Sequence, residues 1–226
     1  MRLIKNFSEI KENDFDILMV NSDQTWRKCM NYFYDVAFLK FAEHWNKIKF
    51  NYGSSLGVKV WTFNKEDEKI AKNLLKNFTG LSVREISDVE LIKKHLGFKV
   101  QFVLDPTLLI DKKYYLKLIK NFESDIINQV NNNNYFFSYI IDKNNQVEEF
   151  LYGIINSKGV ITDSYHGTIF SIIFKKPFIS FQEELVDSRF NSLKKILDIQ
   201  NRIFTFDSIP PISLLNQPLI INETKL

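Results

Sequence analysis

Residues 159–181 read GVITDSYHGTIFSIIFKKPFISF, and their pattern of apolar and polar residues is the most informative in the chain. A short apolar run over Gly159–Thr162 leads into a polar turn. A helical run over Ile169–Phe174 that is apolar nearly all round follows, and then a second apolar run over Phe178–Phe181. Continuous apolar strands are typical of a parallel sheet that is covered on both faces. The stretch therefore predicts a strand–helix–strand unit of an α/β fold.

The same alternation extends outward through the 226 residues. The other predicted strands are Asp16–Val20, Ile48–Tyr52, Leu81–Val83, Val100–Leu104, Tyr135–Ile141 and Arg202–Phe206. Apolar residues at helical spacing predict helices over Lys65–Phe78, Ser87–Leu96, Val147–Ile155 and Phe190–Leu197. Ser87 and Glu90 have the spacing of a capping box, and Gly97 follows the last apolar residue of that helix. Alternating strands and helices predict parallel-sheet, Rossmann-like lobes.

Two features indicate a division of the chain. Asp105 and Pro106 close a predicted strand, and Asn131–Asn134 is a polar tract without packing capacity. We place the boundary between roughly 110 and 134, so that residues 1–120 form a first lobe and residues 121–226 a second.

The composition excludes several classes of function. The net charge of +3 is small, and no dense Lys/Arg run is present, so we expect no nucleic-acid partner. Cys29 is the only cysteine, which excludes an internal disulfide and a four-cysteine zinc site, and we predict no metal. No apolar run approaches the ~20 residues that cross a bilayer. We expect the cytoplasm, with its membrane face as the alternative.

The polar turn after Thr162 carries the main candidate site residues. Ligands of open α/β sheets gather at the carboxyl ends of strands, and the free N–H groups of the next helix favour an anion. Gly167 would let the backbone approach a ligand, while Ser164, His166 and Thr168 add hydroxyl and imidazole groups. A helix cap made by Ser164 or Asp163, with His166 packed nearby, explains the pattern equally well.

This stretch, TDSYHGTIFSIIFKKPF, resembles the signature of the polysaccharide pyruvyl transferase family. DFDILMVNSDQTW, LSVREISDVELIKKHLG and FVLDPTLLI resemble further segments of that family in the same order, and NYGSSLG is a weaker match. Together the segments extend from about residue 14 to residue 204. The departures are Asn21, where a glycine is usual, and a looser version of the block at Asn51–Gly53.

The resemblance implies a two-lobed fold similar to a GT-B glycosyltransferase, here truncated, with the acceptor on the first lobe and the donor on the second. It implies transfer of pyruvate from phosphoenolpyruvate, as co-substrate without another cofactor, to a sugar of a polysaccharide or lipid-linked glycan. The product is a ketal of a surface polysaccharide. Two other classes stay open: a non-catalytic relative that binds an anionic ligand or a partner, and a GT-B-type glycosyltransferase.

The resemblance assigns His166 to proton transfer, for which imidazole is suited near neutral pH. The carboxylate and phosphate of the donor call for arginine and helix N-termini. Arg84 lies between a predicted strand and helix, and Arg189 opens a helix, so both are donor-binding candidates beside Ser164, Gly167 and Thr168. The alternative for Arg84 is a surface ion pair with Glu85 or Asp88.

Two candidates on the first lobe have further alternatives. Asp23 and Gln24 either bind hydroxyls of the acceptor sugar or cap a helix after Ser22. Asp105 is best explained as the end of a strand, because the residue before proline favours extended backbone.

The resemblance also implies missing parts. Family members usually open with further strand–helix units, and have another unit between YFFSYIID and VEEFLYGIINS, where only Lys143–Gln146 stand here. A parallel crossover needs a dozen or more residues. We therefore expect poor transfer by this chain alone, an uncovered sheet edge, and self-association or a partner as the remedy.

Overall fold

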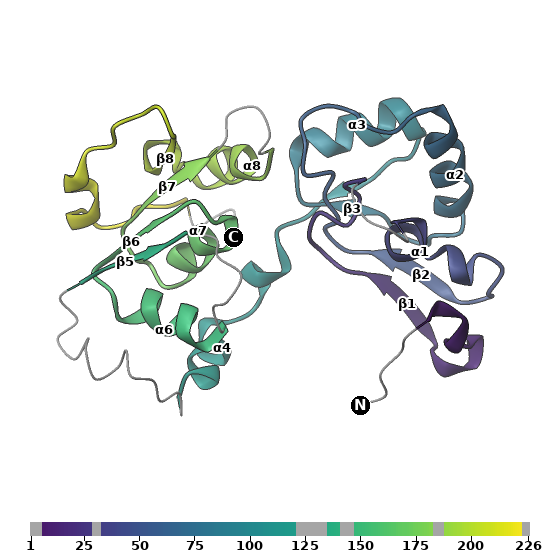
Figure 1. Cartoon of the computed structure of the whole chain (residues 1–226), viewed down its shortest axis with the longest axis horizontal. Coiled ribbons are helices and arrows are strands. Elements are labelled where there is room, and N and C mark those ends of the chain that lie inside the picture. The colour runs from purple at the N-terminus through teal and green to yellow at the C-terminus, as the bar shows by residue number, and fades with distance from the viewer. Residues whose placement is uncertain (1–5, 29–32, 121–134, 141–146, 183–187, 223–226) are drawn as a thin grey trace. The chain divides into compact units, whose positions relative to one another are not determined.

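A computed structural model describes residues 6–28, 33–120, 135–140, 147–182 and 188–222. The chain divides into two compact units, Met1–Pro106 and Thr107–Leu226, and each contains parallel strands with helices between them (Figure 1). The division falls just before the stretch 110–134 indicated by the sequence. The predicted α/β class with parallel sheets is confirmed.

The first unit arranges its strands in chain order. Its strands are β1 (Ile17–Val20), β2 (Ile48–Asn51), β3 (Ser82–Val83) and β4 (Gln101–Phe102), its α-helices are α1 (Phe33–Phe38), α2 (Lys65–Leu75) and α3 (Ile86–Leu96), and its short 3-10 helices are Phe7–Glu9, Glu12–Asp14 and Lys40–Ala42. β1 pairs with β2 and β3 with β4, both in parallel. Single bridges from Phe50 to Gly80 and from Ser54 to Val83 join the two pairs. The carboxyl ends of all four strands therefore meet at one edge.

The sequence predicts α2 and α3 of the first unit, whereas α1 was not predicted. The capping box predicted at Ser87 is wrong. The N-cap of α3 is Glu85, because the Asp88 N–H already donates to the Glu85 carbonyl and closes the first turn there. Gly97 ends α3 in the left-handed region, at a φ of 78°, as the sequence predicts.

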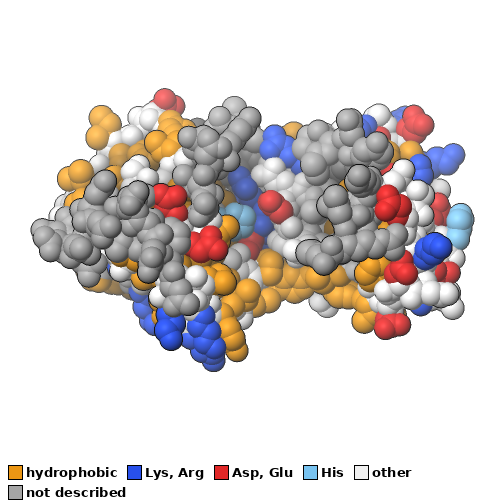
Figure 2. Space-filling view, turned by 60° about the horizontal axis from the view of Figure 1, so that its bottom comes forward, with side chains coloured by type: hydrophobic (Ala, Val, Ile, Leu, Met, Phe, Trp, Pro, Cys, Tyr) orange, Lys and Arg blue, Asp and Glu red, His pale blue; other side chains and the backbone are white. Residues whose placement is uncertain are grey.

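One face of the first sheet is apolar and exposed. Ile17 and Met19 of β1 are 51% and 52% exposed, and Ile48 of β2 is 52% exposed. Residues two apart on a strand point to the same face, and Ile48 lies opposite Ile17 in the register. Figure 2 shows hydrophobic side chains at the surface in the region of this unit.

The second unit has a four-stranded parallel sheet in the order β5-β6-β7-β8. Its strands are β5 (Phe136–Tyr139), β6 (Gly159–Thr162), β7 (Phe178–Gln182) and β8 (Ile203–Thr205), its α-helices are α4 (Lys112–Leu118), α6 (Val147–Asn156), α7 (Tyr165–Ile173) and α8 (Ser188–Leu197), and further 3-10 helices are Pro106–Leu109, Gln200–Arg202 and Ile212–Asn216. The buried core includes Leu151, Ile154, Val160, Ile169, Phe178 and Phe190. All eight strands predicted from the sequence are therefore present, with boundaries that differ by a residue or two. Ile141, at the end of the predicted fifth strand, lies outside the described residues.

The connection between β5 and β6 is long enough for a parallel crossover. β5 pairs directly with β6, with Phe136 opposite Gly159, and α6 lies between them in the chain. The link covers residues 140–158, which exceeds the dozen residues that such a crossover needs. The length problem expected at Lys143–Gln146 therefore does not arise, although those four residues lie outside the described part.

Among the residues that the structure describes, no helix is long and apolar enough to cross a membrane.

Candidate functional site

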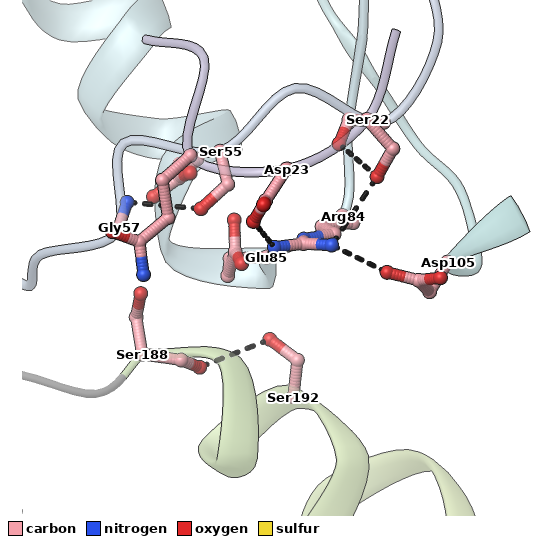
Figure 3. A network of polar contacts seen from close by, with 12 residues as sticks. Ser22, Asp23, Ser55, Gly57, Arg84, Glu85, Asp105, Ser188 and Ser192 are labelled. Carbon is pink, nitrogen blue, oxygen red and sulfur yellow. Dashed lines mark hydrogen bonds and ion pairs between the residues drawn. The ribbon is translucent and has the colours of Figure 1, made fainter. Parts of the chain in front are cut away.

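Three of the four strands of the first unit lead into one polar cluster, which we call the arginine cluster. It comprises Ser22, Asp23, Arg84, Glu85 and Asp105. Ser22 and Asp23 follow β1, Arg84 and Glu85 follow β3, and Asp105 follows β4. Figure 3 shows the guanidinium of Arg84 between Asp23 on one side and Asp105 on the other. The edge at which parallel strands end is the usual place for a ligand in this fold class.

Arg84 is buried, and side chains contact each nitrogen of its guanidinium. Nη1 donates to Asp105 Oδ2 and, at 3.3 Å, to Ser22 Oγ; Nη2 donates to Asp23 Oδ1 at 2.8 Å. Nε lies 3.5 Å from Glu85 Oε1. The side chain of Arg84 is only 1% exposed. The surface ion pair considered for Arg84 is therefore wrong, because the loops that follow the strands enclose it.

Asp105 forms a buried ion pair that the sequence did not indicate. Its side chain is 1% exposed and pairs with Arg84, so it does more than end a strand. A buried charge needs a partner, and Asp105 and Arg84 supply one another. The signal that could have revealed this was its place after β4, at the same sheet edge as Arg84.

Two further acids are buried beside Arg84. Glu85 and Asp88 are both fully buried at the start of α3. Burial raises the pKa of the Glu85 carboxyl well above its usual range, and the neighbouring Asp88 raises it further. Burial also raises the pKa of Asp88, whose Oδ2 accepts a hydrogen bond from Leu56 N at 2.9 Å. Neither oxygen of Glu85 has a hydrogen-bond partner with regular geometry among the described residues. The cluster thus contains a buried acid whose surroundings favour its protonated form.

Asp23 and Gln24 do not cap a helix, because the described residues after Ser22 form turns. The backbone of Asp23 has a φ of 104° and bridges to Ser54. Gln24 Oε1 accepts a hydrogen bond from Arg27 at 2.8 Å, and its side chain packs against Gly57. The capping alternative is therefore wrong, and the contact of Asp23 and Gln24 with acceptor hydroxyls stays a prediction.

In the second unit, Ser164 is the N-cap of α7. Its Oγ accepts a hydrogen bond from Gly167 N at 3.2 Å, and its own N–H donates to Thr162 Oγ1 at 3.0 Å. The helix-cap interpretation of Ser164 is thus confirmed. A contact of Ser164 with the donor substrate stays a prediction. Ser164 would have to make that contact while it also caps α7.

Gly167 and Thr168 face the interior of the second unit. Thr168 Oγ1 contacts Ser180 Oγ at 2.7 Å and donates to Ser164 O at 3.2 Å, and the residue is fully buried. A Cβ on Gly167 would lie 2.6 Å from Thr162 Oγ1. Glycine is therefore needed here for the close approach of α7 to β6, which differs from the ligand approach inferred from the sequence. Their roles toward a donor stay predictions.

Tyr165 is the common neighbour of His166 and Arg189. His166 is half-buried, and its ring meets the Tyr165 ring edge to face, with 5.5 Å between centroids. The guanidinium carbon of Arg189 lies 5.1 Å from the centre of the same Tyr165 ring, within the range of a cation–π contact. The structure thus brings two of the predicted site residues onto one buried ring.

Two further polar residues near this turn were missed from the sequence. Gln182 ends β7 and Ser188 begins α8; both are buried. Gln182 Oε1 and Ser188 Oγ have no hydrogen-bond partner among the described residues. A glutamine at the carboxyl end of a parallel strand was the available signal.

Among the residues that the structure describes, no group of His, Cys, Asp and Glu side chains could hold a metal ion.

The fold and these edges define an α/β protein with two parallel-sheet units, each with polar side chains where its strands end. The chain belongs to the polysaccharide pyruvyl transferase family, whose sequence model matches residues 2–183. The matched range contains both Arg84 and the turn from Asp163 to Thr168. Comparison with curated proteins and with solved structures gives no match.

Proposed function

We propose that the chain transfers pyruvate from phosphoenolpyruvate to a sugar, forming a ketal in surface polysaccharide biosynthesis in the cytoplasm. Membership of the family supports this proposal. The observation that carries it is the position of His166 in the first turn of α7, directly after β6, within the stretch that resembles the family signature. A GT-B-type arrangement of the two units belongs to the same proposal.

The chemistry requires controlled proton transfer. A sugar hydroxyl attacks C2 of phosphoenolpyruvate while C3 gains a proton to become a methyl group. A second hydroxyl then attacks C2, the bond from C2 to the bridging oxygen breaks, and inorganic phosphate leaves. The two hydroxyl protons balance the proton gained by C3 and the one carried by the phosphate. We assign proton transfer to His166, since imidazole exchanges protons near neutral pH.

The charges of the donor call for cations. Arg84 and Arg189 are the proposed contacts for its carboxylate and phosphate, with the start of α7 as a further anion-binding element. Ser164, Gly167 and Thr168 would act mainly by shaping that start, given their inward contacts. We keep Asp23 and Gln24 as the proposed contacts of the acceptor, and no cofactor besides the co-substrate is required.

The direct test is release of inorganic phosphate in a coupled assay with phosphoenolpyruvate and a panel of sugars. We expect release that depends on both substrates. Binding of phosphoenolpyruvate without release of phosphate in the presence of any of the sugars would favour the second candidate, a non-catalytic anion-binding relative. The observation in favour of that candidate is that Arg84 is already paired with two carboxylates.

We also propose that the chain self-associates through the first unit. Parallel sheets are normally covered on both faces, whereas Ile17, Met19 and Ile48 are about half exposed. Size-exclusion chromatography with light scattering should give a mass above that of one chain. A monomer at all concentrations would contradict this part of the proposal alone.

A further inference from the structure

Arg202 carries a buried charge that pairs with no carboxylate among the described residues. It is 4% exposed and lies in the short helix that connects α8 to β8 (Figure 1). Nη1 donates to the carbonyl of Leu214, and Nη2 donates to the carbonyls of Gln217 and Pro218 at 3.2 and 3.1 Å. These bonds hold the segment that follows β8. Carbonyl oxygens carry no net charge, however, so the positive charge of Arg202 lacks a counter-ion in the described part of the chain.

Arg202 also lines a cavity of about 690 Å³, a size typical of small-molecule sites. One wall is the turn between α8 and β8, which contributes Asp198 and Asn201. The other wall is the segment whose carbonyls Arg202 binds, and it contributes Gln217 and Asn222. The backbone N–H of Asn222 donates to the carbonyl at the end of α8 at 3.2 Å. Hydrogen bonds therefore join the two walls, and the cavity is preorganised.

The guanidinium of Arg202 has donors for a ligand beyond those that hold the wall. A guanidinium carries five N–H groups. Among the described residues, the three carbonyl bonds use Nη1 once and Nη2 twice, which leaves the N–H of Nε and one N–H of Nη1. A carboxylate or phosphate oxygen would form charge-assisted hydrogen bonds with them and would balance the buried charge. The cavity therefore suits an oxyanion at Arg202.

The other groups of the lining suit the hydroxyls and ring of a sugar. Asn201 and Gln217 are exposed amides that can donate and accept, and the exposed carboxylate of Asp198 can accept from a hydroxyl. A bare anion would meet Asp198 as a like charge, whereas a ligand with hydroxyl groups would bind to it. Pro218 and Ile220 add apolar surface. The combination favours an oxyanion that is carried on a sugar over a bare inorganic anion.

The cavity is separate from the candidate site of the second unit. Arg202 directly precedes β8, at its amino end, whereas the turn from Asp163 to Thr168 follows the carboxyl end of β6, and the sheet is parallel. We propose that this cavity is a second ligand site, which binds an acidic sugar through its carboxylate or phosphate at Arg202. This site goes beyond the proposed transfer reaction and does not depend on it.

The test is calorimetric titration of the full chain with glucuronate, with glucose 6-phosphate and with neutral glucose. Arg202→Gln removes the buried charge. Asn201→Asp adds a negative charge to the cavity and leaves the carbonyl bonds of Arg202 in place. Asn191→Asp is the matched control, because it makes the same change in charge at an exposed position near the opposite end of α8.

We expect wild type to bind at least one acidic sugar, and to bind glucose about 10-fold more weakly or less. Arg202→Gln should weaken binding of that acidic sugar by about 10- to 150-fold, the range for loss of a charge-assisted contact. Asn201→Asp should weaken it by about 2- to 6-fold, and Asn191→Asp by less than about 2-fold. Tighter binding of glucuronate would identify a carboxylate site, and tighter binding of glucose 6-phosphate a phosphate site.

Three results would overturn the site: no binding of either acidic sugar to wild type, equal binding of glucose, or equal affinity of wild type and Arg202→Gln. Thermal melting checks that Arg202→Gln folds. If it does not, Asn201→Asp decides, and an affinity equal to that of Asn191→Asp would overturn the site. Phosphate release from phosphoenolpyruvate is measured separately, so failure of this site leaves the proposed function standing.

Discussion

The carboxyl edges of the two sheets are stabilised by different kinds of polar contact. At the edge of the first sheet, the buried Arg84 is held by the carboxylates of Asp105 and Asp23. At the edge of the second sheet, the turn before α7 is held by hydroxyl contacts of Thr162, Ser164 and Thr168. The parallel topology is alike in both units, so the side chains after each strand decide what an edge can do.

This difference predicts where each edge is sensitive. A buried ion pair loses much when one partner is removed, because the other charge is left unpaired. A hydroxyl network loses less, since each of its bonds is neutral. Changes in the first edge should therefore affect stability and anion binding, whereas His166 at the second edge should affect turnover.

The largest effect is expected for Asp105→Asn. It leaves Arg84 buried without its buried partner, and we expect the free energy of unfolding of the first unit to fall by about 3–5 kcal/mol. The double variant Arg84→Gln/Asp105→Asn removes both charges and should lose clearly less than the sum of the two single variants. Urea unfolding of all four proteins measures the coupling. Additive losses would show that the pair is not coupled.

The next effect is on catalysis. In a sample that releases phosphate, His166→Gln should reduce turnover by ~100-fold or more and leave the affinity for phosphoenolpyruvate largely intact. The control is His44→Gln, at an exposed position of the first unit. Steady-state rates and calorimetry separate the two quantities. Unchanged turnover would remove His166 from the mechanism.

Packing at the second edge should give a smaller effect. In Gly167→Ala the new methyl group would meet Thr162 Oγ1 at 2.6 Å, so α7 must shift from β6. We expect a loss of about 1–3 kcal/mol in stability. Gly80→Ala is the control, because the nearest atom would lie at an ordinary 3.8 Å. Equal thermal melting curves for the two variants would show that the close approach is not needed.

A further effect on stability is gradual and depends on pH. The folded chain holds the Glu85 proton to higher pH than the unfolded chain, whose glutamate titrates near 4.5. Above that pH the unfolded state binds fewer protons, so stability should fall by about 1.4 kcal/mol per pH unit until Glu85 ionises in the folded state. Glu85→Gln removes this decline, while the titration of Asp88 stays in both proteins. Parallel stability curves between pH 5 and 8, by the same urea method, would show that Glu85 is already ionised.

The sequence predicted the elements better than it predicted the site. All eight strands were found. Several of them are continuous apolar runs, which are typical of buried parallel strands. The partners of Arg84 were not found, because Asp23 and Asp105 lie 61 and 21 residues away in the chain. Long-range pairing of charges leaves no local pattern. The start of α3 was also missed, because Glu85 is its N-cap although the Glu85 side chain makes no capping hydrogen bond.

We expect this family member to recognise phosphoenolpyruvate. The most direct measurement is the melting temperature of the chain with phosphoenolpyruvate, beside uridine and guanosine diphosphate sugars at equal concentration. A ligand that binds only the folded state stabilises it, by about 2.7 kcal/mol at 100 times its Kd. We expect phosphoenolpyruvate to raise the melting temperature and the nucleotide sugars to leave it unchanged. Stabilisation by a nucleotide sugar and none by phosphoenolpyruvate would contradict the proposed donor and favour a glycosyltransferase.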